Sequence, residues 1–153
     1  MKGLLPLIYR LYRLSWRMTR PLFVGVRIIL VQDGQVLLVR QTYEHQWYFP
    51  GGAVKRGEIL VDAAMRESQE ESCVTCLATP RLLGMYMNLY EGKNDHIAVF
   101  VCDQFQVGAA TDRWEIAACQ LFPLTALPAD LALGCARRLQ DYQNGPGPYV
   151  GKW

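Results

Sequence analysis

Apolar and polar positions alternate near the start of the chain in a way that predicts a β-hairpin. Residues 24–30 carry apolar side chains at every second position, a period that is typical of a strand. Asp33-Gly34 follows, and this dipeptide is a strong signal for a two-residue hairpin turn. Residues 35–41 are therefore expected to form the returning strand. Farther on, Pro50-Gly51-Gly52 predicts another change of chain direction.

The pattern changes to a helical period in the middle of the chain. Val61, Ala64, Met65 and Ser68 recur at the spacing i, i+3, i+4, i+7, which predicts a helix over residues 60–72 with these side chains on its buried face. Two more strands are expected at 81–90 and 96–105, joined by the turn-like segment 91–95. A short strand over 115–122 and a last helix over 129–142 complete the predicted elements.

The first 21 residues differ from the rest. Their apolar positions fall on one helical face and their arginines gather beside it, so residues 1–21 are expected to form a basic amphipathic helix ahead of a domain at 22–153. This helix either packs on the domain or on a partner subunit, as in a homodimer, or contacts a membrane surface or RNA from outside. The pattern leaves these alternatives open.

Composition narrows the class of protein. A chain of 153 residues, 51% apolar and 20% charged, is long enough for one sizeable core and too apolar for a disordered chain. Its net charge of +2 argues against a generally basic nucleic-acid binder. Five cysteines in apolar surroundings do not resemble a secreted disulfide framework, so we expect a cytoplasmic protein.

Three acids on the central predicted helix carry the first chemical signal. Glu67, Glu70 and Glu71 stand at i, i+3, i+4, so their carboxylates share one side of the helix and repel each other. Hard oxygen ligands at this density are typical of Mg²⁺ or Mn²⁺ sites, where an ion would relieve the repulsion. Taken by themselves, the three acids could equally be ordinary solvated surface glutamates.

The three acids belong to a longer pattern. Gly52, Glu58, Arg66, Glu67, Glu70 and Glu71 follow the spacing Gly-x5-Glu-x7-Arg-Glu-x2-Glu-Glu. With this motif the sequence resembles the Nudix hydrolase family, and the likeness extends over about residues 22–142. The resemblance implies an α/β fold of the family's kind, an α/β/α sandwich with a mixed β-sheet.

The resemblance also implies an activity: metal-dependent hydrolysis of a diphosphate linkage in a nucleoside diphosphate derivative. By this match, Glu70 and Glu71 are metal ligands and Glu67 is a ligand or the general base. Glu58 is an outer ligand, and the carbonyl group of Gly51 completes the set. The catalytic residues are then Glu67 and Glu70, with Arg66 orienting the carboxylates. The alternative is a catalytically silent nucleotide-binding or regulatory module on the same fold.

Some assignments stay open at this level. The general base of the family sometimes comes from outside the motif, so four further acids are candidates: Glu91, Asp95, Asp103 and Glu115. Trp47 is expected to stack on a nucleobase, with a place in the core as its alternative.

Two positions depart from the family pattern. Ser68 stands where the family has an aliphatic residue, and its hydroxyl is expected to bond back to the carbonyl group four residues earlier. Cys73 stands where the family usually has glycine after the acidic helix. If the helix ended there in the left-handed conformation that glycine takes, a side chain would cost about 1 kcal/mol, so we expect a changed helix end and an intact site.

Overall fold

A computed structural model describes residues 22–90, 93–109 and 115–153 of the chain. A six-stranded sheet in the order β7-β2-β1-β5-β4-β8 forms its centre, and β3 and β6 make a separate pair. The strands are β1 (Leu22–Gln32), β2 (Gln35–Gln41), β3 (Val74–Cys76), β4 (Arg81–Tyr90), β5 (Lys93–Cys102), β6 (Phe105–Val107), β7 (Ile116–Pro123) and β8 (Tyr149–Lys152). The helices are α2 (Leu60–Ser72) and α3 (Leu133–Asn144).

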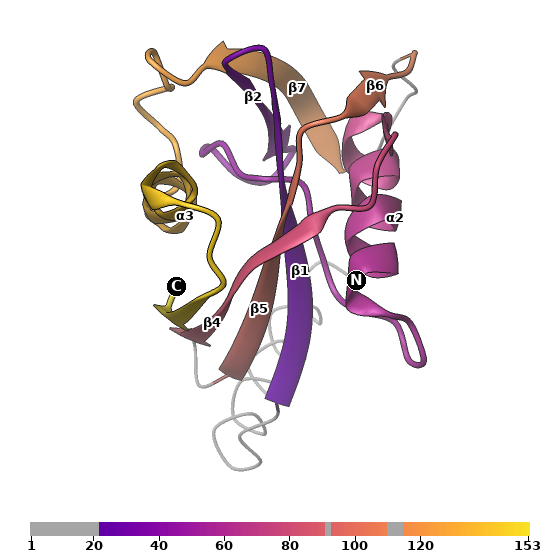
Figure 1. The fold of residues 1–153 in the computed structure, drawn as a ribbon, viewed down its shortest axis with the longest axis vertical. Coiled ribbons are helices and arrows are strands. Elements are labelled where there is room, and N and C mark those ends of the chain that lie inside the picture. Colours follow the sequence, from indigo (N-terminus) through magenta and orange to yellow (C-terminus); the bar gives the residue numbers. More distant parts are fainter. Residues whose placement is uncertain (1–21, 91–92, 110–114) are drawn as a thin grey trace, which may run out of the picture.

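The predicted fold class is confirmed. The sheet is mixed, because β1 runs antiparallel to β2 and parallel to β5, and β4 runs parallel to β8. Helices α2 and α3 lie on opposite faces of this sheet (Figure 1). The architecture is therefore an α/β/α sandwich.

Strand β1 supplies side chains to both layers of the core. Val26 and Ile28 belong to the apolar cluster that contains Ala63 and Ala64 of α2. Ile29 follows Ile28 in sequence and belongs to the cluster under α3. Successive side chains of a strand point to opposite faces, so one run of apolar residues fills both layers and places β1 in the centre of the sheet.

The first predicted hairpin has the turn that its sequence indicates. Asp33 and Gly34 have φ angles of 52° and 73°, the positive values that both central residues of a type I′ turn need. Leu30 then pairs with Leu37 and Gln32 with Gln35. The turn sets the register of β1 against β2.

We expect Gly34→Ala to lower the free energy of unfolding by about 1 kcal/mol, because a side chain in the left-handed region is strained. A Cβ atom at Gly34 would meet nothing within 4 Å, so backbone strain is the whole effect. Gly151→Ala is the control, because its Cβ atom would also stand in open space and its φ angle lies outside the positive range. Urea unfolding of both variants tests this, and equal midpoints would contradict it.

The second hairpin differs from its prediction. Strand β5 begins at Lys93 and ends at Cys102, three residues earlier than expected, so Asn94 and Asp95 pair with β4 as part of the strand. Phe105 belongs to β6 and pairs with Cys76 of β3. The predicted turn extends too far along the chain, because polar residues at the end of a strand resemble a loop.

The last helix also begins later than predicted. Residues 129–132 are not helical, because the N–H group of Trp47 donates to the carbonyl group of Asp130 and the N–H group of Ala132 donates to that of Trp47. The carbonyl group of Asp130 and the N–H group of Ala132 are therefore hydrogen-bonded to Trp47 and are not available to a helix. Strand β8, which follows Gly147 and lies beside β4, was not predicted.

The predicted basic helix at residues 1–21 lies outside the described residues. Its contacts, a homodimer and a cytoplasmic location therefore stay predictions. None of the helices in the described part of the chain is long and apolar enough to cross a membrane.

Candidate active site

Helix α2 confirms its predicted bounds and part of its predicted buried face. Ala64 and Ser68 are buried as predicted, whereas Val61 and Met65 are only half-buried. The buried face also includes Ala63 and two acids, Glu67 and Glu71, which are 9% and 8% exposed. Small residues let α2 approach the sheet closely, so the acids of the next turns are carried inward with them. The correction matters chemically, because two of the three clustered acids are not solvated surface groups.

The end of α2 corrects two predictions. Cys73 has φ and ψ angles of 54° and 26°, so the helix keeps the left-handed end that glycine would take, and the N–H group of Cys73 donates to the carbonyl group of Gln69. The Ser68 hydroxyl lies 2.8 Å from the carbonyl oxygen of Met65 and 3.2 Å from that of Val74. The hydroxyl therefore bonds to the carbonyl group three residues earlier, not four, and also links α2 to β3.

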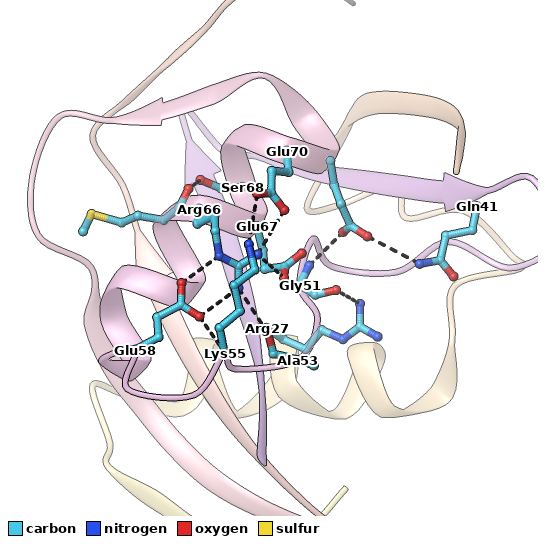
Figure 2. A network of polar contacts seen from close by, with 12 residues as sticks. Arg27, Gln41, Gly51, Ala53, Lys55, Glu58, Arg66, Glu67, Ser68 and Glu70 are labelled. Atoms are coloured by element: carbon cyan, nitrogen blue, oxygen red, sulfur yellow. Dashed lines mark hydrogen bonds and ion pairs between the residues drawn. The ribbon is translucent and has the colours of Figure 1, made fainter. Parts of the chain in front are cut away.

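Arg66 is the centre of the polar network. Its guanidinium group forms a two-point pair with Glu58, at 2.7 Å from Nε to Oε1 and 2.9 Å from Nη2 to Oε2. Its Nη1 atom lies 2.6 Å from Glu67 Oε1 and 3.0 Å from Glu70 Oε2. Figure 2 shows these three carboxylates converging on the one guanidinium group from α2 and from the loop before it. Arg66 thereby offsets the repulsion among the acids.

The same network shifts the pKa values of its members. The hydrogen bonds from Arg66 lower the pKa of Glu58 to about 2, with help from the N–H group of Lys55. The carboxylate of Glu58 in turn raises the pKa of Arg66 above its ordinary value. Both groups therefore stay ionised through the neutral range.

Glu71 has a different environment. Its Oε2 atom accepts a hydrogen bond of 2.8 Å from the N–H group of Gly51, and the side-chain amide of Gln41 lies 3.4 Å from Oε1. Burial raises the pKa of Glu71, and the charge of Glu67 adds to this, while the Gly51 hydrogen bond and Arg27 act against it. A nearby cation would favour its ionised form.

Two glycines let the acids of α2 reach the backbone. Gly51 has a φ angle of 153°, and a Cβ atom there would collide with the carbonyl group of Val26 and with Arg27. A Cβ atom on Gly52 would stand 2.7 Å from Glu67 Oε1. Any side chain on the two glycines of the predicted Pro-Gly-Gly turn would therefore displace Glu67 or strand β1.

Sequence reasoning missed Arg27, which holds this segment from the other side. Its Nη1 atom donates to the carbonyl oxygens of Phe49 and Gly51, at 2.9 and 3.2 Å. The predicted metal-ligating carbonyl group of Gly51 is therefore hydrogen-bonded to Arg27. A signal was present in the sequence, because Arg27 is a charged residue within an apolar strand, where such residues are rare.

The carboxylates have the donor chemistry that a divalent cation requires. Ionised oxygens from Glu67, Glu70 and Glu71, with a backbone carbonyl group close by, suit Mg²⁺ or Mn²⁺. Within the described ranges, no three carboxylate, histidine or cysteine side chains are arranged as they stand to hold a metal ion. Arg66 draws Glu67 and Glu70 to itself, and the Gly51 N–H group draws Glu71. Arg66 thus competes with a cation for the same oxygens.

Trp47 lies apart from the acids. It is 6% exposed, its ring meets the edge of Phe122 at 4.9 Å between centroids, and the guanidinium carbon of Arg40 stands 4.9 Å from the ring centre. Both neighbours belong to the sheet. The packing favours the core alternative for Trp47 over stacking on a nucleobase.

The other base candidates are spread over the structure. Asp95 lines a cavity beside Gly52. Glu115 lies close enough to Tyr43 to raise the pKa of that phenol, as does Glu71, although burial is the larger cause. Asp103 is exposed in the turn after β5, and Glu91 lies outside the described residues. Asp95 and Glu115 are therefore the two that approach the motif.

A protein-family model covers most of the chain. The family model described as NUDIX domain matches residues 21–142, which include every strand of the central sheet except β8, helix α2 and the acidic motif. The chain belongs to the Nudix family. Members of this family are hydrolases that generally depend on divalent metal ions and act on nucleoside diphosphate derivatives or RNA caps.

Individual Nudix proteins resemble the chain in part or throughout. An RNA pyrophosphohydrolase of Tolumonas auensis is 43% identical over 63 residues, 38% of this chain and 36% of that protein. The chain thus spans little more than a third of that relative's length. A MutT NUDIX hydrolase from Burkholderia pseudomallei superimposes with a TM-score of 0.70 at 24% identity, over 79% of this chain and 98% of the other. A UDP-X diphosphatase gives a TM-score of 0.69 at 26% identity, over 85% and 67%.

Proposed function

We propose that this protein hydrolyses a diphosphate linkage in a nucleoside diphosphate derivative, using Mg²⁺ or Mn²⁺. The observation that carries the proposal is the joint placement of Glu67, Glu70 and Glu71 beside the Gly51-Gly52 segment, with Arg66 bridging two of the acids. A protein has little structural reason to bury two of three repelling acids, since each ionised group loses its hydration. Binding of a cation and a polyphosphate gives such a reason.

Glu67, Glu70 and Glu71 would hold the metal ion, with Glu58 and the carbonyl group of Gly51 farther out. A divalent ion supplies, when bound, neutralisation of the charge that builds on the phosphate oxygens and a lower pKa for a water that it coordinates. Glu58 acts through Arg66, because its two oxygens fix the plane of the guanidinium group. Arg66 then sets the rotamers of Glu67 and Glu70.

Glu67 is the proposed general base. Its carboxylate is almost fully buried, Oε1 is held by Arg66, and both oxygens lie against Gly52. A fixed carboxylate accepts the proton of an attacking water with little reorganisation. The alternatives are Asp95, which lines the cavity beside Gly52, and Glu115, which like Glu71 lies near Tyr43.

Two alternatives deserve separate tests. The likeness to an RNA pyrophosphohydrolase makes RNA that carries a pyrophosphate group a second substrate class. A catalytically silent nucleotide-binding module would keep the fold and the cluster of acids without turnover. Substrate panels distinguish the first alternative, and binding without hydrolysis identifies the second.

The test is phosphate release, coupled to a phosphatase, across nucleoside diphosphate sugars, dinucleotides, oxidised nucleotides and pyrophosphate-bearing RNA. Each compound is incubated with Mg²⁺, Mn²⁺ or chelator. We expect turnover of one compound class that chelator abolishes and added metal restores. Calorimetric binding of nucleotide without any turnover would instead identify the silent module.

A further inference from the structure

Two of the five cysteines come together between α2 and the sheet. Cys102, the last residue of β5, belongs to the buried apolar cluster that contains Ala63 and Ala64 of α2. Cys76, the last residue of β3, packs against the same cluster. Strands β3 and β5 belong to different sheets, so tertiary packing places these two side chains in one layer.

The sulfur of Cys102 lies against the backbone that follows Cys76. Cys102 Sγ stands 3.2 Å from the carbonyl oxygen of Gln104 and 3.9 Å from that of Ala78. The same carbonyl group of Gln104 accepts a hydrogen bond of 2.8 Å from the N–H group of Leu77, the residue after Cys76. These contacts hold the end of β5 next to the end of β3.

The two thiols contact each other directly. The thiol of Cys76 donates a hydrogen bond to the sulfur of Cys102, which raises the pKa of Cys76 and lowers the pKa of Cys102 to about 7. The other polar neighbour of Cys76 is Ser68 of α2, whose Oγ atom lies 3.9 Å from Cys76 Sγ. The pair therefore combines a sulfur that ionises readily, the nucleophilic form of cysteine, with a second thiol in contact with it.

Solvent reaches this pair from the side of Cys76. Cys102 is 3% exposed, whereas Cys76 is half-buried. Cys73 and Cys135 are buried, and Cys119 is exposed on β7, at one edge of the central sheet. A small oxidant therefore has access to Cys76 and Cys119, and of these two Cys76 has a second cysteine beside it.

We propose that Cys76 and Cys102 form a reversible disulfide when a hydroperoxide oxidises the protein, and that this disulfide fastens the end of α2 to β5. The inference is independent of the proposed function. Strand β3 begins two residues after α2 ends, and the Ser68 hydroxyl of α2 donates to the carbonyl group of Val74 in β3. A covalent link at Cys76 therefore restrains the helix as well as the strand.

The reaction needs only the two cysteines and the hydroperoxide. In the first step the thiolate attacks one peroxide oxygen and the O–O bond breaks, which leaves a sulfenic acid and, with hydrogen peroxide, a hydroxide ion. In the second step the remaining thiol attacks the sulfenic sulfur, the S–O bond breaks, and the thiol proton leaves with the hydroxyl group as water. Two thiols thus lose two electrons and two protons, and one hydrogen peroxide becomes two water molecules.

The first experiment maps the link by mass spectrometry. The protein is treated with hydrogen peroxide, unfolded, alkylated and digested with trypsin without a reductant. We expect the peptide 67–81, which holds Cys73 and Cys76, to be joined to the peptide 94–113, which holds Cys102, and dithiothreitol to separate them. Cys76→Ser should abolish the link. Cys73→Ser is the matched control, because it changes the other cysteine of the same peptide, and it should keep the link.

Thermal unfolding of the oxidised and reduced proteins gives the second readout. The disulfide closes the loop from residue 76 to residue 102 and restricts the unfolded chain, so the oxidised wild type should unfold about 5–15 °C above the reduced form. Cys102→Ala replaces a buried thiol with a small apolar side chain, so it should fold and show no such rise. Cys119→Ser, at the exposed cysteine of β7, should behave as the wild type.

Three results would overturn the inference. The first is that Cys76 and Cys102 are both still alkylated after peroxide has fully oxidised Cys119. The second is that both are converted to sulfinic acids without becoming linked. The third is a link that survives Cys76→Ser, which would make Cys73 the partner of Cys102. A link that needs Cys76 and Cys102, tolerates Cys73→Ser and yields to dithiothreitol would support it.

Discussion

Replacement of Glu70 by glutamine is expected to lower kcat by at least about 100-fold and to leave the fold intact. The change removes one proposed metal ligand, while the amide keeps the size of the side chain. The Glu70 side chain is 53% exposed, so the substitution creates no buried cavity. It removes one of the three clustered acids of α2 and also the ion pairs of Glu70 with Arg66 and Lys55, so the free energy of unfolding should change by only a few tenths of a kcal/mol.

Asp62→Asn is the matched control, because Asp62 is an exposed acid in the first turn of the same helix. Steady-state kinetics at several metal concentrations and urea unfolding should be measured for both variants. We expect the Glu70 variant to need more metal for half-maximal activity and the Asp62 variant to behave as the wild type. Wild-type turnover after Glu70→Gln would refute the assignment of Glu70 to the site.

Arg66→Lys should be almost as damaging, although it conserves the charge. Arg66 contacts Glu58 through Nε and Nη2 and both Glu67 and Glu70 through Nη1, and a single ammonium group cannot reproduce this spread of contacts. We expect kcat/KM to fall by about 10–100-fold, because the carboxylates lose their fixed orientation. The free energy of unfolding should fall by about 1–2 kcal/mol, because Glu67 is buried and loses a hydrogen bond to a charged group.

Arg137→Lys, at an exposed position of α3, is the control for the exchange of arginine by lysine. Thermal unfolding with and without Mg²⁺ adds a second readout. Since Arg66 holds the oxygens that a cation would use, the stabilisation of the Arg66→Lys protein by Mg²⁺ should exceed that of the wild type. An Arg66→Lys protein with unchanged kcat/KM would show that Arg66 serves only the fold.

Local signals predicted much of the fold because they depend on few residues. The Asp33-Gly34 turn was correct, since positive φ angles restrict the choice of residue at both positions. Helix α2 was also correct from Leu60 to Ser72. In each case the backbone conformation and the side-chain spacing lie within one short segment.

The errors concern groups whose partners are far away in the chain. The start of α3 was placed too early because Trp47 takes the backbone hydrogen bonds of residues 130–132. Strand β8 is four residues long and exists through its pairing with β4. The burial of Glu67 and Glu71 follows from the close approach of α2 to the segment at Gly51, which no helical period reveals.

The sequence by itself determined the family, the sandwich architecture and the six positions of the acidic motif, because all of these are written in fixed spacings. Only the tertiary structure decided how the motif is assembled. It buried two of its acids, gave Arg66 three carboxylate partners, and brought in Arg27 from β1 to hold the glycine segment. It also placed Asp95 beside the cavity that Gly52 lines. These contacts join residues that are distant in the chain, and a spacing along the chain carries no information about which surfaces will meet.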